Sequence, residues 1–310
     1  MVKDNEIKAQ VSPFAIREGE IKTFDGKDGY VSMNQIVHKI NIGHITDIHF
    51  AILDLVNEFE FITSRQLYQM LEIKGIDPKS QDKLNNKLDA LVKSKILTRY
   101  YFTSDEGKGI YRIYCLEKMG KYLLTSKETE CKWQPSDNTK PVPMIKKRLA
   151  GNQVLIAYLR KVKAFDSYVV KPAITAKTAG KVFKATGGSV KLTKNNKSIQ
   201  FLFEVFRREL DWQKKLVEKM NLYKDFYGNF VPGDSGFSNV PQLIFVCEDE
   251  KHMAECFKEI VTNKVEIPQI KLLFTTDLRQ NEDTLANTLV EFKLVDGKYK
   301  MENVELKLIG

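Results

Sequence analysis

The first half of the chain takes its fold from one segment, KSQDKLNNKLDALVKSKILTRYYFTSDEGKGIYRIYCL, residues 79–116. Its first part places Leu84, Leu88 and Leu91 on one side of a helix, because positions three and four apart share a helical face. Its second part holds two runs rich in β-branched and aromatic residues, separated by a glycine-containing turn at 104–109. Such runs predict a β-hairpin. The segment therefore predicts a helix followed directly by a hairpin.

Two further helices are predicted immediately before this segment. Apolar residues recur at helical spacing over residues 48–59. Thr63 and Gln66 have the spacing of a capping box, so a second helix begins there and ends near Gly75. The order helix, helix, helix, hairpin is that of a winged helix-turn-helix domain, which we expect at residues 45–126.

The rest of the chain predicts a second domain. Residues 1–44 form an N-terminal extension whose path the sequence does not indicate, and residues 127–143 are a proline-containing linker. Residues 144–310 alternate between helical and strand patterns, and SIQFLFEVF at 198–206 is typical of a buried central strand. This order resembles a degenerate restriction-endonuclease-like core. The expected fold class is α+β with two domains.

The positive charge of the chain is concentrated in one segment. The formal net charge is +9, and residues 131–200 hold 15 Lys and Arg residues against only two carboxylates, Asp137 and Asp166. Such a local excess favours a polyanionic partner, most simply the phosphates of nucleic acid. A lysine-rich solvated surface is the alternative.

The expected partner is double-stranded DNA, because the third helix of a winged helix enters the major groove with its polar face. Asp82 and Asp89 would repel phosphate, so a protein-interaction adaptor or a transcription regulator stays open as an alternative. The predicted contacts lie on the third helix, on the hairpin and in the basic segment: Lys79, Ser80, Lys83, Asn86, Lys87, Lys93, Lys108, Arg112, Lys146, Lys147 and Arg148.

A metal-dependent nuclease or relaxase-like enzyme is the other alternative. Glu204 stands where a nuclease core would place the glutamate of a Glu-x-Lys pair, but Phe206 occupies the lysine position. No carboxylate lies between Asp166 and Glu204, whereas a hard divalent cation needs clustered oxygen ligands. We therefore predict no catalytic residue, and we expect Glu204 to form a structural ion pair.

No cofactor or metal is expected from the remaining residues. The cysteines show no CxxC spacing and the four histidines are widely scattered, so the sequence predicts reduced thiols and no zinc site. No stretch has the roughly 18 apolar residues of a membrane span, and residues 1–10 lack a signal-peptide core. A cytoplasmic protein without membrane contact is expected. The sequence leaves a homodimer open, because winged helices often dimerise but no heptad repeat is present.

Three stretches resemble the replication-relaxation family of Gram-positive plasmids and mobile elements. They are ITSRQLYQML with LDALVKSKILTRYY, then IYRIYCLEKMGKYLL, and later FLFEVFRRE, YKDFYGNF and PQLIFVCEDE, together spanning about residues 48–276. The resemblance implies DNA binding tied to plasmid replication, transfer or maintenance, with replication or transfer proteins as partners and a degenerate nuclease-like second domain. The chain departs from the pattern by lacking an acidic residue before the Glu204 strand, which argues further against nuclease activity.

Overall fold

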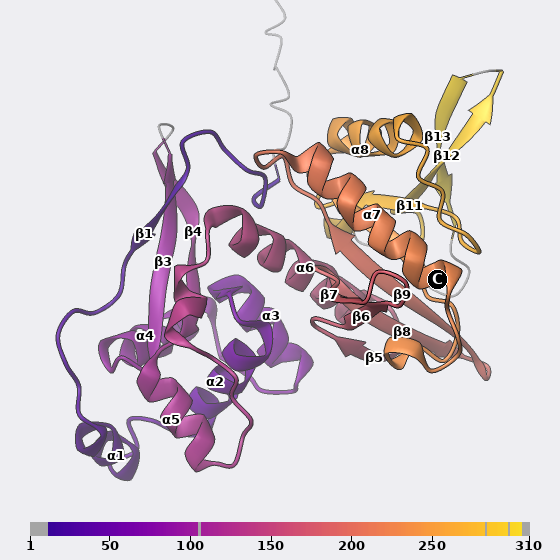
Figure 1. The fold of residues 1–310 in the computed structure, drawn as a ribbon. Helices are drawn as coiled ribbons and strands as arrows, with labels where there is room; N and C mark the ends of the chain where they lie inside the picture. The colour runs from indigo at the N-terminus through magenta and orange to yellow at the C-terminus, as the bar shows by residue number, and fades with distance from the viewer. Residues whose placement is uncertain (1–11, 105–106, 283, 297, 306–310) are drawn as a thin grey trace, which may run out of the picture.

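A computed structural model describes residues 12–104, 107–282, 284–296 and 298–305, and its fold is mixed α+β (Figure 1). The first half contains the following elements: β1 (Ile21–Phe24), α1 (Met33–Asn41), α2 (Asp47–Phe59), β2 (Ile62–Thr63), α3 (Ser64–Ile73), α4 (Gln81–Lys93), β3 (Leu97–Ser104), β4 (Gly107–Leu116) and α5 (Lys118–Ser126). Three helices followed by a hairpin, the order predicted for residues 48–116, are therefore confirmed.

Local signals explain where α3 and α4 begin. The Thr63 side chain accepts a hydrogen bond from the Gln66 backbone N–H at 3.2 Å, and the Gln66 side chain accepts one from the Thr63 N–H, so the predicted capping box is present. Ser80 caps α4 in the same way, by accepting from the Lys83 N–H at 3.2 Å. Leu84, Leu88 and Leu91 are then buried on the inner face of α4.

The N-terminal extension, whose path the sequence left open, joins this unit. β1 pairs antiparallel with β3, and the resulting sheet has the order β1-β3-β4-β2. Before β1, residues 12–20 run to the second half of the chain. There Ser12 donates a hydrogen bond to Asp277, and the Ile16 N–H donates to Glu248 at 3.1 Å.

The second half follows a short 3-10 helix, η1 (Pro135–Thr139). Its elements are α6 (Val142–Lys161), β5 (Phe165–Val169), β6 (Ala173–Ala176), β7 (Lys181–Lys184), β8 (Gly188–Lys194), β9 (Lys197–Val205), α7 (Trp212–Gly228), η2 (Asp234–Gly236), β10 (Gln242–Cys247), α8 (Glu250–Thr262), β11 (Leu273–Thr276), η3 (Arg279–Asn281), β12 (Leu289–Val295) and β13 (Lys298–Val304). The predicted central strand is β9.

A seven-stranded sheet organises these elements, with the order β13-β12-β11-β10-β9-β8-β5. β9, β10 and β11 are parallel, and the other strand pairs are antiparallel. Phe201 and Phe203 of β9 pack in the same core as α6, whereas Leu202 packs with α7 and α8. Alternate side chains therefore bury the two faces of the sheet under different helices, as a central strand requires.

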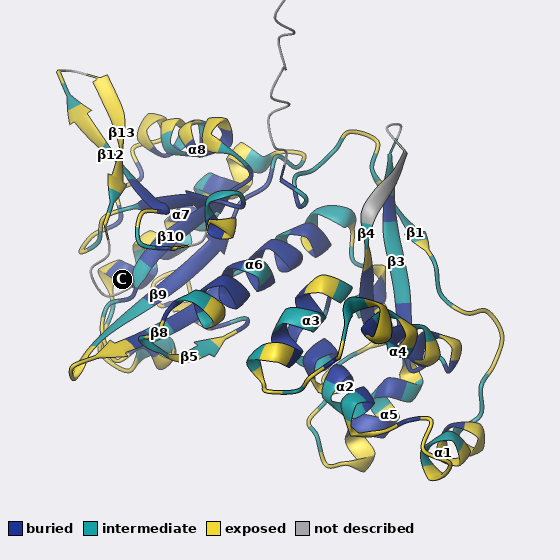
Figure 2. Cartoon of the chain, turned by 180° about the vertical axis from the view of Figure 1, so that it is seen from behind, coloured by how far each residue is buried: buried dark blue, intermediate teal, exposed yellow. Residues whose placement is uncertain are grey.

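The two halves share one hydrophobic core. α6 lies between the helices of the first half and the sheet, and it is buried along most of its length (Figure 2). The Gln66 side chain donates to the Leu149 carbonyl at 2.8 Å, and the Asn152 side chain donates to the Phe61 carbonyl at 2.7 Å. These bonds between buried groups fix α6 against β2 and α3. The surface between the halves therefore has a defined shape.

Candidate nucleic-acid interface

The polar face of α4 is open to solvent. Lys83, Asn86 and Lys93 are exposed, and neither half of the chain covers them. Lys87 is half-buried, and the hydroxyl of Ser80 is engaged in capping the helix. The predicted recognition surface is thus displayed rather than folded against the protein.

Lys79 lies just before this helix, in the left-handed backbone region with φ of 68°. Its ammonium pairs with Asp77 at 2.8 Å, and its backbone N–H donates to the same carboxylate at 2.7 Å. These contacts lower the pKa of Asp77 and raise that of Lys79. Both side chains are exposed, so the pair is weak and Lys79 can exchange Asp77 for a phosphate.

Among its described side chains, the hairpin contributes one exposed cation. Arg112 on β4 is exposed, and its Nε donates to Asp25 at 3.1 Å. Asp25 also pairs with Arg99 at 2.9 Å, so it is shared between two guanidinium groups. The side chain of Lys108, which the sequence predicted to contact DNA, lies outside the described residues.

A cleft of about 1060 Å³ lies beside this surface, between α3, α4 and the hairpin on one side and α6 with η3 on the other. Four cationic residues line it: Arg65, Arg112, Arg160 and Lys161. None of the described residues that line the cleft is an Asp or a Glu. With four cations and no carboxylate in its lining, the cleft attracts anions.

Helix geometry adds to this attraction. Ser64 and Arg65 form the first turn of α3, and Gln81 begins α4, so both helices start at the cleft. The N-terminus of a helix carries a partial positive charge and unpaired N–H groups, both of which favour anions. Arg160 approaches Glu72 only to 3.9 Å and keeps 45% of its side chain exposed. It is therefore available to a phosphate.

The structure corrects the prediction for Lys146 and Arg148. Both side chains are buried, and neither is open to DNA. Lys146 pairs with Glu20 and donates to the Ala15 carbonyl, which ties α6 to residues 12–20. Arg148 donates to the Val170 carbonyl at 2.9 Å, and burial lowers its pKa to about 10.

Lys147, the third predicted cation of this group, is half-buried and forms an ion pair with Glu209. The cations at the start of α6 are thus paired or hydrogen-bonded within the protein. Arg160, the exposed cation of α6, lies at its other end, beside the cleft.

Sequence reasoning missed Arg65, Gln81 and Asn85 as members of a site. A weak signal for Arg65 was available, because it follows the Thr63 cap by two positions and so lies in a helical first turn. No local sequence signal indicates that α6 forms the opposite wall of the cleft, because α6 is distant from α3 and α4 in the chain.

Glu204 is part of a closed polar cluster. Its carboxylate accepts hydrogen bonds from Tyr223 at 2.6 Å and Thr186 at 2.7 Å, and Lys219 lies 3.4 Å away. Its side chain is almost fully buried. The predicted structural ion pair is confirmed, with Lys219 as the partner. Burial, followed by the Glu204 charge, raises the pKa of Tyr223 well above its usual value.

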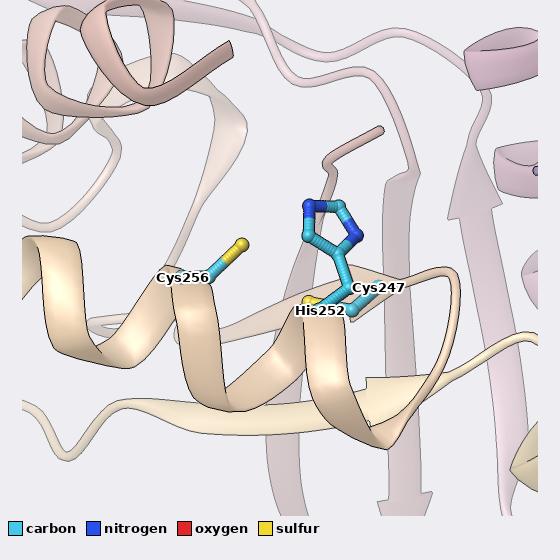
Figure 3. A group of neighbouring side chains, drawn as sticks. All are labelled: Cys247, His252 and Cys256. Atoms are coloured by element: carbon cyan, nitrogen blue, oxygen red, sulfur yellow. The ribbon is translucent and has the colours of Figure 1, made fainter. Parts of the chain in front are cut away.

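A group of metal-ligating residue types is brought together elsewhere, at the end of β10. Cys247, His252 and Cys256 are buried, and their ligand atoms lie within 4.8 Å of one another (Figure 3). The sequence did not predict this group, although the positions of His252 and Cys256 four residues apart on α8 were a signal. Among the described residues, no other such group of three is found.

The hydrogen bonding of His252 argues against metal binding by these three residues. Its Nδ1 accepts the Glu248 backbone N–H at 3.3 Å, so the proton of the neutral ring sits on Nε2. A metal on Nε2 would need that proton on Nδ1, facing the Glu248 N–H. Burial, with help from Arg208 and Arg207, lowers the pKa of His252 to about 3 and keeps the ring neutral. The group packs as part of the core.

Comparison with protein-family models finds no match, and no curated protein matches the chain. Among solved structures, the chain is similar to the restriction endonuclease FokI, at 9% sequence identity and a TM-score of 0.27. The match covers 75% of this chain and 43% of the FokI chain. A TM-score this low establishes no shared fold. In the described part of the chain, no helix is both long and apolar enough to cross a membrane.

Proposed function

We propose that the chain is a non-catalytic protein that binds double-stranded DNA. The observation that carries this proposal is the cleft beside α4, whose described lining includes four cationic residues and no carboxylate. α2, α3, α4 and the β3–β4 hairpin act as a winged helix. The exposed face of α4 enters the major groove, where Lys83 and Asn86 meet base edges. Arg65, Arg112 and Arg160 contact the phosphates along the mouth of the cleft.

The environment of Glu204 supports the absence of catalysis in this proposal. Its carboxylate is already occupied by Tyr223, Thr186 and Lys219, and it belongs to no group of three metal-ligating side chains among the described residues. A divalent cation that activates water needs several oxygen ligands. We propose the second half as a degenerate nuclease-like domain that holds α6 in place against the winged helix.

Titration with a 30-base-pair duplex at several salt concentrations tests the proposal. Neutralising phosphates releases counterions, so the logarithm of the affinity falls with the logarithm of the salt concentration by about 0.9 for each contact. We expect Arg65→Ala and Arg160→Ala each to weaken binding and to reduce this slope. The matched control is Lys258→Ala, which removes an exposed cation from α8, away from the cleft. Absent binding, or equal slopes for all variants, contradicts the proposal.

The family resemblance of the sequence extends the proposal to replication, transfer or maintenance of a plasmid or mobile element. Footprinting on the DNA that flanks the gene of this protein tests this part. A protected site there supports it, and uniform protection along the whole fragment contradicts it.

A further inference from the structure

The cleft is lined by amides as well as by cations. Six side-chain amides belong to its lining, and they come from both halves of the chain: Gln69, Gln81, Asn85, Gln153, Gln280 and Asn281. An amide offers both a donor and an acceptor, the combination that base edges present. Phosphates need only donors. The amides therefore indicate a ligand that carries donors as well as acceptors.

Two of these amides have a buried oxygen without a hydrogen-bond partner, Gln69 Oε1 and Gln280 Oε1. Gln280 is 1% exposed, and its Nε2 donates to Thr275 Oγ1 at 2.8 Å, which leaves only the oxygen unpaired. An unpaired buried acceptor destabilises the protein until it gains a donor. Both side chains line the cleft, so a ligand N–H group that enters it can satisfy these oxygens. The amino groups and ring N–H groups of nucleobases are such donors.

The size of the cleft selects the form of the nucleic acid. Its volume of about 1060 Å³ lies just above the roughly 300–1000 Å³ found for pockets that hold drug-sized ligands. That space suits a few nucleotides of one strand and is too small for a turn of duplex. Tyr101 on β3 lines the same cleft, and aromatic rings stack on the faces of unpaired bases.

We propose that the cleft binds a short unpaired DNA strand continuous with the duplex held by α4, so that the protein recognises a junction between double-stranded and single-stranded DNA. This inference rests on the proposed function, because α4 must first hold the duplex. Asn85 and Gln153 contact the bases of the unpaired strand from opposite walls.

Three DNA probes that share one duplex sequence test the inference: the blunt duplex, the same duplex with unpaired strands at one end, and one strand alone. We expect the forked probe to bind about tenfold more tightly than the blunt duplex, the gain that one or two recognised bases supply. A 2-aminopurine placed next to the fork reports directly whether an unpaired base enters the cleft, through a change in its fluorescence.

Two sets of variants separate this inference from the proposed function. The pair Asn85→Ala with Gln153→Ala abolishes the gain for the fork, so that the forked and blunt probes bind with equal affinity. The pair Lys83→Ala with Asn86→Ala weakens both probes equally. Gln213→Ala, which removes an exposed amide on α7, is the matched control and changes neither.

Equal affinity of the wild-type protein for the forked and blunt probes overturns the inference and leaves the proposed function standing. A gain that survives the pair Asn85→Ala with Gln153→Ala, or that accompanies no change in 2-aminopurine fluorescence, also overturns it. Binding to neither probe overturns both proposals.

Discussion

Arg207 donates two hydrogen bonds from Nη2 to the two carboxylate oxygens of Asp277, at 2.8 and 2.9 Å, and both side chains are almost fully buried. The pair joins the ends of β9 and β11. Removal of one partner leaves the other as an uncompensated buried charge, which typically costs about 3–5 kcal/mol.

We therefore expect Asp277→Ala to lower the free energy of unfolding by about 3–5 kcal/mol in urea denaturation. The double variant Arg207→Met with Asp277→Leu removes both charges and fills similar space, so it should be less destabilised than Asp277→Ala alone. A double variant at least as unstable as the single one would argue against charge burial as the cause.

Lys146 and Arg160 lie near opposite ends of α6 and should behave in opposite ways. Lys146→Met breaks a buried pair with Glu20, so we expect it to lower the free energy of unfolding by about 3 kcal/mol and to leave the salt slope of DNA binding unchanged. Arg160→Ala should change stability by less than about 0.5 kcal/mol and reduce the salt slope by about 0.9. Denaturation and salt titration of the same two proteins decide this, and a reversed pattern contradicts the assignment.

The exposed face of α4 should determine sequence preference more than overall affinity. Asn86→Ala removes a side chain that can pair with adenine, at a cost of about 1–3 kcal/mol on the preferred site alone. Affinity for unrelated duplexes should hardly change. Selection from a random pool of duplexes before and after the substitution measures this, and an unaltered selected sequence would show that Asn86 recognises no base.

Gly151 allows α6 to approach the β7–β8 turn. A Cβ at this position would lie 2.5 Å from the Thr186 carbonyl oxygen and 2.9 Å from Gly187 Cα, both backbone atoms. We expect Gly151→Ala to cost about 1–3 kcal/mol. Gly228, at the end of α7, has its first neighbour at 3.9 Å, so Gly228→Ala is the matched control and should be neutral or slightly stabilising in thermal denaturation. Similar losses in both variants would contradict this packing argument.

His252 should make the protein sensitive to acid. Its pKa is lowered to about 3 by burial and by Arg208 and Arg207, whereas an imidazole in the unfolded chain takes up a proton near pH 6.5. The contribution of the neutral His252 ring to the free energy of unfolding is therefore complete above pH 6.5. It is lost as the pH falls toward 3, by about 1.4 kcal/mol per pH unit. Urea denaturation at pH 7, 6 and 5 should show that the free energy of unfolding falls less with pH for His252→Asn than for the wild type. Equal losses would place the acid sensitivity in other groups.

The sequence predicted elements that depend on neighbouring residues. The Thr63 and Gln66 capping box, the inner face of α4 and the β3–β4 hairpin each follow from interactions within about twenty residues, so their patterns are visible in the chain. The buried strand β9 was equally clear, because a strand covered on both faces needs apolar side chains at nearly every position.

The long-range contacts were not predictable in this way. The sequence placed Lys146 on a DNA-binding surface because it lies among other cations, whereas the groups that pair with it, Ala15 and Glu20, lie in the N-terminal extension. The cleft was missed for a similar reason. Gln81 and Gln153 meet only after α6 has packed against α3, and that packing is specified by buried apolar residues rather than by the amides themselves.

The path of residues 12–20 has a consequence for protein synthesis. Ser12 is bonded to Asp277, which lies 265 positions later, and at about 5–20 residues per second the ribosome needs roughly 10 to 50 s to add the residues between them. The groups that hold residues 12–20 thus emerge in stages, from Lys146 through Glu248 to Asp277. The bond to Asp277 is a late step in co-translational folding, and a chain released before that residue keeps Ser12 without its carboxylate.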